Sequence, residues 1–514
     1  MAAYIPCVGT DVKTNMSVVV RLDHHAATRN TAPNGGKASA ATHAAPLNGV
    51  QNQGKTPMTR IDKARTATVS LSRRDVIRQA AAAGVLGAIG APALMPSAAL
   101  GQSAFNWKRF AGQKIDVLLV KNPRSDLMQA AEKAFTELTG ITVSSEQVPE
   151  QQQRQKAMIE FTSGKPTFDV AHLSMHVQKR LSEKGKWMGD LRPVIADGSM
   201  TNPDFDFPDI GKAGLNFCTA ADGSLNAIPT FVDYWILYYN KELFAQKGVA
   251  YPTTMDEIFT AAQKLHDPAK GVAGFVSRGL KNANVPVWTS WMLGQGAVTV
   301  SADGKLLTDT PEAIWAAELY KKLNRDVAPA GAIGFNWNEC QTTFGQGRAA
   351  MWLDGIGFAT PLEDATKSKI AGKVGYGVVP KGPKAQHSAI FGDGLGIASS
   401  SKNKGPAWYY IQYITNKANQ LNILKNGAGS PARNSPFANQ EIVRSSKFGK
   451  QWFDCVLESA KVGRPGLPVI IPVTEFRDVF GVALTNMISG ADPKTELVKA
   501  TEAFKPVLEK SEKG

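Results

Sequence analysis

Aromatic residues stand beside carboxylate, amide or arginine residues at several places in this chain. Asp233 lies between Phe231 and the pair Tyr234–Trp235 in an otherwise apolar run. A carboxylate in such a run is costly to bury unless a hydrogen-bond donor meets it. Aromatic rings pack against C–H faces, and carboxylates accept hydrogen bonds from hydroxyl groups. We therefore expect this segment to contact a ligand, although Asp233 could instead bind the backbone of its own segment.

Two further segments repeat this combination of residue types. Trp337 lies between Asn336 and Asn338, and Trp352 precedes Asp354 by two residues. We expect Trp337, Trp352 and Asp354 to be ligand contacts as well. For Trp337, a polar loop that enters the next helix is the alternative.

Other candidates depend on spacing or on neighbouring glycines. Trp288 and Trp291 are three residues apart, so they could line a ligand site or pack on one helix face into the core. Asp393 stands between two glycines, which would let a ligand approach closely or would form a plain turn. Arg433 could bind a ligand or form a surface ion pair. Arg124 lies in the loop after the first expected strand, and we expect it to be a ligand contact as well.

The sequence offers little for a metal site, a cofactor or catalysis. His172 and His176 have the spacing of two helical metal ligands, but no HExxH motif and no third ligand accompany them. The chain lacks a GxGxxG motif after its first strand, a P-loop, a CxxC pair and GxSxG. We expect no cofactor and no enzyme, although paired acids for glycoside hydrolysis have no sequence signature.

Charge and cysteine content limit the classes of partner and the chemistry that we expect of this chain. Residues 1–101 hold 11 Lys and Arg against 4 Asp and Glu, and the remainder holds 47 against 40. The longer part is thus only mildly basic and has no basic run, so we expect no nucleic-acid partner. Cys7, Cys218, Cys340 and Cys455 are expected to be buried or inert thiols, with any pairing among the last three left open.

The first hundred residues have the character of a leader. Residues 1–57 show no apolar period and are expected to be a disordered extension that is dispensable or not translated. Residues 58–101 contain a basic segment, then an Ala- and Gly-rich stretch, then small residues. This order is typical of a secretory signal peptide, which we expect to be cleaved near residues 99–102. The Ser72–Arg78 segment resembles a twin-arginine export signal. An uncleaved membrane anchor is the alternative, but Pro92 and Pro96 make it the poorer one.

The remainder alternates between expected strands and helices. Strands are expected at 114–120, from 141 and at 168–173, with a helix between the first two that begins at Ser125 and ends at Gly140. This alternation predicts an α/β fold with a mostly parallel sheet, whose ligands bind beyond the carboxyl ends of the strands. The loops 121–124 and 173–176 are therefore of interest.

The segment 222–265 has the clearest local signals. Asp222–Gly223 is a turn, Asn240 can cap a short helix that Gly248 ends, and Thr254 with Glu257 forms a capping box for a helix that ends at Leu265. The order of turn, apolar strand, short helix and capped helix is similar to that in the sugar-type (family 1) extracellular solute-binding proteins of bacterial ABC importers. Similar motifs follow in the same order at 344–351, 374–380, 407–410 and 429–433, so the resemblance spans the chain from Lys114 onward.

The resemblance implies a periplasmic-binding-protein-like fold (type II), with two α/β lobes joined by a hinge and the ligand cleft between them. Lobe one would comprise 112–230 plus 380–428, and lobe two 233–378 plus 430–508. It also implies a monomeric periplasmic receptor that closes on a carbohydrate and delivers it to ABC permease subunits in the inner membrane. An aromatic-rich site without strong charge favours a neutral sugar or polyol. The alternatives are the same fold with a polyamine, ferric ion or phosphonate, or an exported carbohydrate-active enzyme.

Overall fold

The computed structural model describes residues 104–513, so the expected extension at 1–57 and export signal at 58–101 lie outside the described residues. Nine strands form one sheet in the order β2-β1-β3-β7-β4-β5, while β6 and β8 pair with β4 and β9 pairs with β7. The strands are β1 (Lys114–Val120), β2 (Thr142–Val148), β3 (Val170–Ser174), β4 (Ile228–Asn240), β5 (Met351–Gly355), β6 (Val374–Val378), β7 (Ser388–Ile397), β8 (Ser430–Pro431) and β9 (Gly463–Pro465).

The sheet is mixed, and the expectation of a mostly parallel sheet was wrong. β1 pairs in parallel with β2 and β3, and β7 with β9, whereas the pairs β3–β7, β4–β5, β4–β6, β4–β7 and β4–β8 are antiparallel. The βαβ pattern that suggested parallel pairing holds only for the first three strands. β4 and β7 return across the sheet after long excursions of the chain, and a local pattern of elements does not set their direction.

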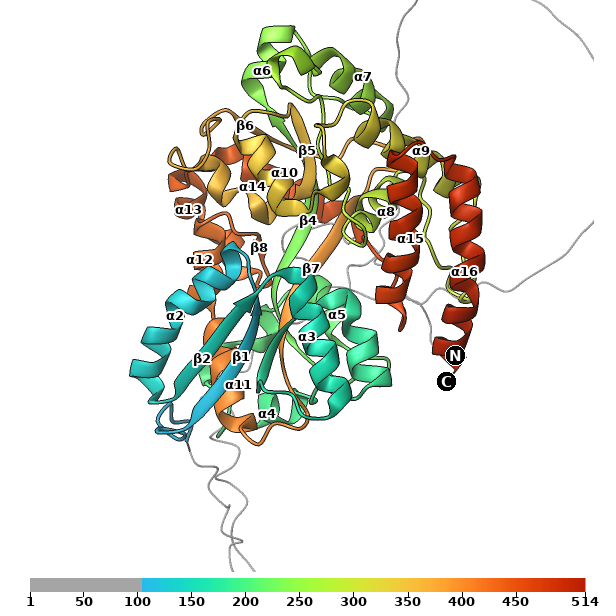
Figure 1. Cartoon of the computed structure of the whole chain (residues 1–514). Helices are drawn as coiled ribbons and strands as arrows, with labels where there is room; N and C mark the ends of the chain where they lie inside the picture. The colour runs from blue at the N-terminus through green and yellow to red at the C-terminus, as the bar shows by residue number, and fades with distance from the viewer. Residues whose placement is uncertain (1–103, 514) are drawn as a thin grey trace, which may run out of the picture. The chain divides into compact units, whose positions relative to one another are not determined.

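β4 connects the two halves of the fold (Figure 1). Its residues 228–234 pair with β7, and its residues 235–240 pair with β5 and β6. All but one of its thirteen residues are buried, because both faces are covered, which explains its almost continuous apolar sequence. The register shifts between Pro229 and Phe231, next to a proline that has no N–H to donate.

The helices divide between these two halves. Around β1, β2 and β3 lie α2 (Pro123–Thr139), α3 (Glu150–Ser163), α4 (Arg192–Ala196), α5 (Lys212–Cys218) and α11 (Lys404–Ile414). The other half holds α6 (Lys241–Lys247), α7 (Met255–Leu265), α8 (Val285–Leu293), α9 (Pro311–Arg325), α10 (Trp337–Gly345), α14 (Gly449–Lys461), α15 (Val473–Ile488) and α16 (Pro493–Lys513). α12 (Lys417–Lys425) and α13 (Gln440–Ser445) lie near the connection.

Several caps form where the sequence signals predict them, and one does not. The Asn240 side chain caps α6, Gly248 ends it in the left-handed conformation, and Thr254 with Glu257 forms the capping box of α7. The cap of α2 is not Ser125 but Asn122, whose side chain accepts hydrogen bonds from the N–H groups of Arg124 and Ser125 at 3.0 Å. The expected loop at 121–124 is therefore shorter, and Arg124 belongs to the first turn of α2.

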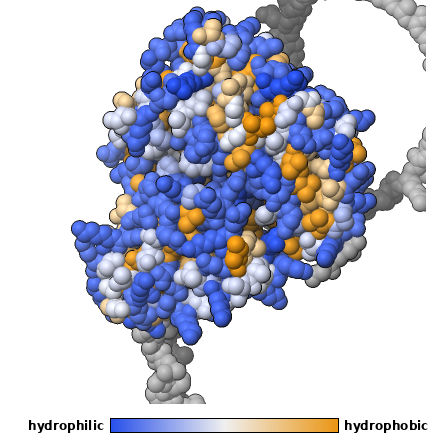
Figure 2. All heavy atoms as spheres, viewed as in Figure 1, coloured by the Kyte–Doolittle hydropathy of each residue, from blue (hydrophilic) through white to orange (hydrophobic). Residues whose placement is uncertain are grey.

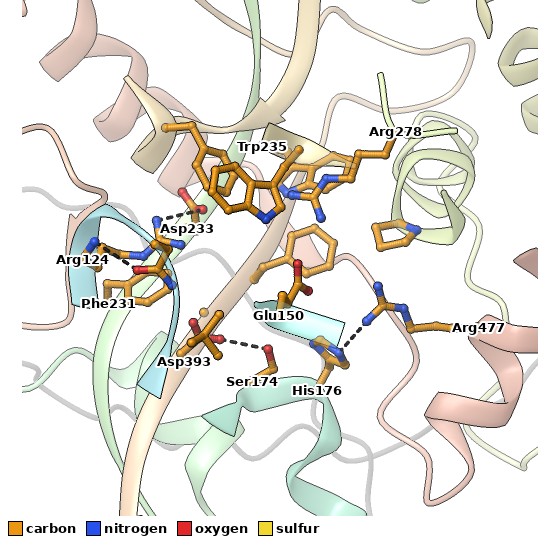
Figure 3. Close-up of a pocket in the computed structure, with 17 residues that line it drawn as sticks. Arg124, Glu150, Ser174, His176, Phe231, Asp233, Trp235, Arg278, Asp393 and Arg477 are labelled. Carbon is orange, nitrogen blue, oxygen red and sulfur yellow. Dashed lines mark hydrogen bonds and ion pairs between the residues drawn. The ribbon is translucent and has the colours of Figure 1, made fainter. Parts of the chain in front are cut away.

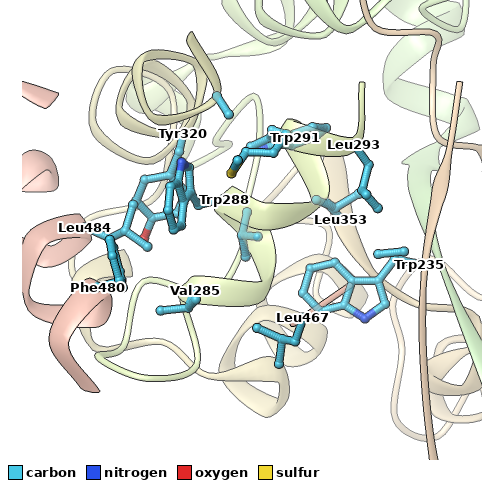
Figure 4. Packing of buried hydrophobic residues seen from close by; sticks show 14 of the residues in the cluster. Trp235, Val285, Trp288, Trp291, Leu293, Tyr320, Leu353, Leu467, Phe480 and Leu484 are labelled. Atoms are coloured by element: carbon cyan, nitrogen blue, oxygen red, sulfur yellow. The ribbon is translucent and has the colours of Figure 1, made fainter. Parts of the chain in front are cut away.

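The core contains most of the large aromatic side chains. Figure 4 shows Trp288 and Trp291 of α8 packed among Tyr320, Phe480 and Leu484. The face in Figure 2 is mostly hydrophilic, with hydrophobic residues in small separate groups. Among residues 104–513, no helix has the length and apolar character needed to cross a bilayer.

The cysteines of the described part are buried and free, as predicted: Cys218, Cys340 and Cys455. Burial raises the pKa of the Cys455 thiol to about 12 and raises the pKa values of Cys218 and Cys340 as well. These thiols therefore stay protonated and unreactive at neutral pH.

Candidate functional site

A cavity of about 70 Å³ lies where β4 crosses between the two halves (Figure 3). Five of the residues predicted from the sequence line it: Arg124, Asp233, Trp235, Trp337 and Asp393. The other lining residues are Val120, Asn122, Glu150, Ser174, His176, Phe231, Arg278, Pro286, Phe358, Phe391, Gly392 and Arg477.

Arg124 reaches the cavity from the first turn of α2. Its guanidinium carbon lies 3.8 Å from the centroid of the Phe231 ring, and its Nη1 lies 3.6 Å from Oδ2 of Asp233. Nη1 also donates to the carbonyl oxygen of Ala428 at 3.4 Å. The stack on Phe231 fixes the plane of the guanidinium, so Arg124 is held in place before any ligand arrives.

Asp233 is a buried carboxylate on β4. Its Oδ1 accepts the N–H of Gly357 at 3.0 Å, and Gly355 approaches so closely that a Cβ there would lie 2.2 Å from Oδ2. Burial raises the pKa of Asp233 to about 6, although Arg124 and the Gly357 N–H oppose the shift. The side chain can therefore accept hydrogen bonds at neutral pH and can also hold a proton in mildly acidic solution.

Asp354 lies behind the cavity wall and pairs with Arg278. The guanidinium donates from Nε to Oδ2 at 2.9 Å and from Nη2 to Oδ1 at 2.6 Å, and its carbon lies 5.1 Å from the ring centroid of Trp235. Burial alone would lower the pKa of Arg278, but Asp354 outweighs it and the pKa is raised. The ion pair thus keeps Arg278 charged at the cavity wall, and Asp354 acts through it.

Asp393 lies on the side of the cavity formed by β3 and β7. Its Oδ1 accepts the hydroxyl of Ser174 at 3.0 Å, and its Oδ2 is 3.5 Å from Nε2 of His172. Burial lowers the pKa of His172, so the ring is neutral at neutral pH. The sequence suggested a turn around Asp393, but the residue lies within β7 and pairs with Ser174 of β3.

Glu150, His176 and Arg477 form a further group that was not among the predicted contacts. His176 Nε2 lies 3.2 Å from Nη1 of Arg477, and Glu150 pairs with Arg154 at 2.9 Å. Burial would raise the pKa of Glu150, but Arg154, Arg278 and Arg477 lower it to about 2. Burial and, after it, Arg477 lower the pKa of His176 well below its usual value, so the ring accepts the hydrogen bond from Arg477 as a neutral group.

The sequence pointed to part of this region through the loop 173–176, which contains His176, although it did not name the residue as a ligand contact. Glu150 follows β2, and Ser174 and His176 lie at or after the end of β3, where open α/β sheets place their ligands. Arg477 has no comparable local signal, because it lies on α15, near the end of the chain, and tertiary packing alone brings it to the cavity.

Five predicted contacts lie elsewhere or point away. Tyr234 follows Asp233 on β4 and joins the core on the opposite strand face. Trp288, Trp291 and Trp352 are buried in the core, Trp288 through an indole N–H bond to the Ala313 carbonyl and Trp352 stacked on Tyr238 at 4.8 Å. Arg433 is also buried. It donates to the carbonyl oxygens of Phe205, Asp206 and Thr415 and lies 3.5 Å from Asp209.

The lining is more strongly charged than the sequence suggested. Three arginines and three acids line the cavity, among the rings of Phe231, Trp235, Trp337, Phe358 and Phe391. Trp337 stacks on Phe358 at 4.7 Å with the rings nearly parallel. The expectation of a site without strongly charged residues was therefore wrong. The formal charges of the three arginines and the three acids nevertheless sum to zero. Such a site offers both hydrogen-bond donors and acceptors around apolar faces.

Three known proteins are similar to most of this chain. The erythritol/L-threitol-binding protein of Mycolicibacterium smegmatis is 27% identical over 415 residues, 76% of this chain and 85% of that protein. An ABC transporter solute-binding protein of Agrobacterium radiobacter, solved with ribitol, is 25% identical with a TM-score of 0.72 and covers 77% of this chain and 99% of its own. One from Agrobacterium vitis, solved with D-mannitol, is 23% identical with a TM-score of 0.70 and covers 77% and 99%.

The likeness to these solved structures shows that the fold is that of the type II periplasmic binding proteins, as the resemblance implied. A sequence model of a family described as bacterial extracellular solute-binding protein matches residues 121–421, which is more than half of the chain. The match begins directly after β1 and includes β2, β3, the whole of β4 and most of the residues that line the cavity. The chain therefore belongs to the bacterial extracellular solute-binding protein family.

Proposed function

We propose that this protein is the periplasmic receptor of an ABC importer and binds a small carbohydrate, a sugar or a polyol, in the cavity at β4. One observation carries the proposal: three guanidinium donors and three carboxylate acceptors line the cavity together with five Phe and Trp rings. Hydroxyl groups donate and accept at once, so a chain of them can bind both sets. Three similar proteins, named above for erythritol/L-threitol, ribitol or D-mannitol, support a polyol-sized ligand.

Binding would proceed by closure of the lobes without any chemical step. Contacts already join elements of the two halves beside the cavity: Arg180 of the first pairs with Glu475 of α15 at 2.6 Å, and His176 meets Arg477. A ligand held between the lobes favours the closed form, which membrane permeases would then recognise. The protein would act as a monomer, and export would depend on the segment 58–101.

Isothermal titration calorimetry of the purified protein tests this function. The panel contains tetritols to hexitols, pentoses, hexoses, maltose, amino acids, spermidine and ferric citrate. We expect one polyol or sugar to bind with one-to-one stoichiometry. Chromatography after the titration should recover this ligand chemically intact. Binding of spermidine, ferric ion or an amino acid alone would contradict the carbohydrate, and turnover of a glycoside would contradict the receptor.

A matched pair of tryptophan variants tests the site. Trp337→Ala removes a half-buried ring that lines the cavity, so we expect the affinity to fall about tenfold or more, since burial of an aromatic face contributes 1–2 kcal/mol or so. Trp315→Ala removes a half-buried ring of α9 that packs against the core. The affinity of Trp315→Ala should equal that of the unchanged protein, and equal losses in both variants would place the site elsewhere.

A further inference from the structure

Arg477 differs from the other buried arginines of residues 104–513 in having no carboxylate partner. Arg124, Arg278 and Arg433 each lie within 4 Å of an aspartate: Asp233, Asp354 and Asp209 respectively. Arg477 is only 3% exposed, yet both groups that accept its hydrogen bonds are uncharged. They are the carbonyl oxygen of Asn282 at 3.0 Å from Nε and His176 Nε2 at 3.2 Å from Nη1.

The acids around Arg477 already have partners of their own. Glu150 pairs with Arg154 at 2.9 Å, and Asp354 takes both hydrogen bonds from Arg278. Asp478 accepts a hydrogen bond from the amide of Asn282 at 3.0 Å. Three guanidinium groups and three carboxylates thus lie at this end of the cavity, but Glu150 and Asp354 bind other arginines and Asp478 binds an amide, so none of them lies within ion-pair distance of Arg477.

An unpaired charge in a buried position is costly, and buried cations in proteins normally meet an anion. Burial, together with Arg154, lowers the pKa of Arg477, which expresses the same cost. The side chain lines the cavity, and Figure 3 shows it at the end opposite Asp393 and Arg124. Its Nη2 has no hydrogen bond to the described residues, so one edge of the fork is available to a ligand.

We propose that the carbohydrate bound here carries a carboxylate, so that it is a polyhydroxy acid of the aldonate class whose carboxylate binds Arg477. This inference rests on the proposed carbohydrate function and narrows it. A guanidinium binds a carboxylate with two charge-assisted hydrogen bonds, which a hydroxyl does not match. At the other end, Asp393 accepts hydrogen bonds and suits the hydroxyl groups of the same ligand.

Matched ligands of equal carbon number separate the acid from the neutral polyol. Calorimetry at pH 7.5 would compare ribonate with ribitol, and mannonate with mannitol, on the unchanged protein. We expect the acid of the preferred pair to bind at least tenfold more tightly, equal to about 1.4 kcal/mol. Polyols that bind as tightly as the acids would overturn this inference and leave the carbohydrate function standing. If neither acids nor polyols bind, both fail.

Two substitutions assign the preference to Arg477. Arg477→Gln should abolish the tenfold preference while polyol affinity changes less, and Arg477→Lys should retain part of it, because the positive charge remains. Arg180→Gln is the control for the ratio of acid to polyol affinity: Arg180 also joins α15 through Glu475 but does not line the cavity, so its loss should affect both ligands alike and leave the ratio unchanged. Circular dichroism would show that each variant is folded. A preference for the acid that survives in Arg477→Gln would overturn the role of Arg477.

Discussion

Asp233 couples the acidity of the site to the stability of the fold. In the folded protein its pKa is about 6, whereas the ordinary value is 3.8, because burial disfavours the charged form. Between these two values the folded protein holds a proton that the unfolded chain has released. The free energy of unfolding therefore falls as pH rises through this range, and above pH 6 the ionised carboxylate costs about 3 kcal/mol.

Asp233→Asn should remove this pH dependence, because the amide does not titrate. Urea unfolding at pH 4.5 and pH 7.5 measures it: relative to the unchanged protein, the variant should gain about 2 kcal/mol between the lower and the higher pH, because part of the full effect is already lost at pH 4.5. The comparison across pH cancels any constant effect of the substitution. A difference between the two proteins that stays the same at both pH values would contradict the shifted pKa.

At the scale of the elements, the end of β5 shapes the site by passing close to β4. Gly355 pairs with Trp235, and its α-carbon lies beside the Asp233 carboxylate, where no side chain has room. Gly357, two residues later, donates the N–H that Asp233 accepts. The short Asp354–Gly357 segment thus orients the Asp233 carboxylate through the Gly357 N–H. The same segment holds Arg278 through Asp354.

Gly355→Ala should weaken ligand binding by displacing Asp233. The added Cβ would lie 2.2 Å from Oδ2, although the backbone at Gly355, with φ of −63°, allows alanine. We expect the affinity to fall by tenfold or so, a size typical of a misplaced polar contact. Gly334→Ala is the control, because a Cβ there meets no atom within 4 Å. Unchanged affinity in Gly355→Ala would show that Asp233 does not bind the ligand.

Local signals in the sequence predict elements better than they predict the site. The capping box at Thr254 and Glu257, and the strand at 114–120, form as predicted, because caps and alternation are properties of neighbouring residues. The glycines around Asp393 suggested a turn, but the structure shows a strand, since glycine also permits close passage of another chain segment. Which side chains face the cavity depends on pairing between distant strands.

The same reason explains the residues that were missed. Asp233 and Trp235 could be found because a carboxylate beside aromatic residues in one apolar run is an unusual combination. Glu150, His176 and Arg477 come from three elements that lie far apart in the sequence. Their approach depends on how α15 packs against the turn after β3, and no spacing along the chain encodes it.

At the scale of the whole molecule, ion pairs between the halves should stabilise the closed form. Arg180 pairs with Glu475 at 2.6 Å and Lys179 with Glu512 at 2.6 Å, so one short segment after β3 contacts both α15 and α16. These side chains are about a quarter to two fifths exposed, and water and salt therefore screen them. Their contribution should be small and dependent on ionic strength.

Arg180→Gln should raise the ligand dissociation rate two- to fivefold, corresponding to roughly 0.5–1 kcal/mol, with the difference shrinking in 0.5 M salt. Stopped-flow displacement of the bound ligand measures this rate. Lys450→Gln is the control, because Lys450 pairs with Asp454 within α14 alone. An increase that persists at high salt would point to lost packing instead of a lost ion pair.

The buried thiols have a practical consequence for fluorescence measurements. Cys218, Cys340 and Cys455 are enclosed in the core and held in the protonated form. Within residues 104–513, a maleimide dye added to the folded protein should therefore attach only to cysteines introduced on the surface. One such cysteine on α2 and another on α9 would carry a donor and an acceptor on the two halves, so that ligand binding could be followed as a change in energy transfer without replacing Cys218, Cys340 or Cys455.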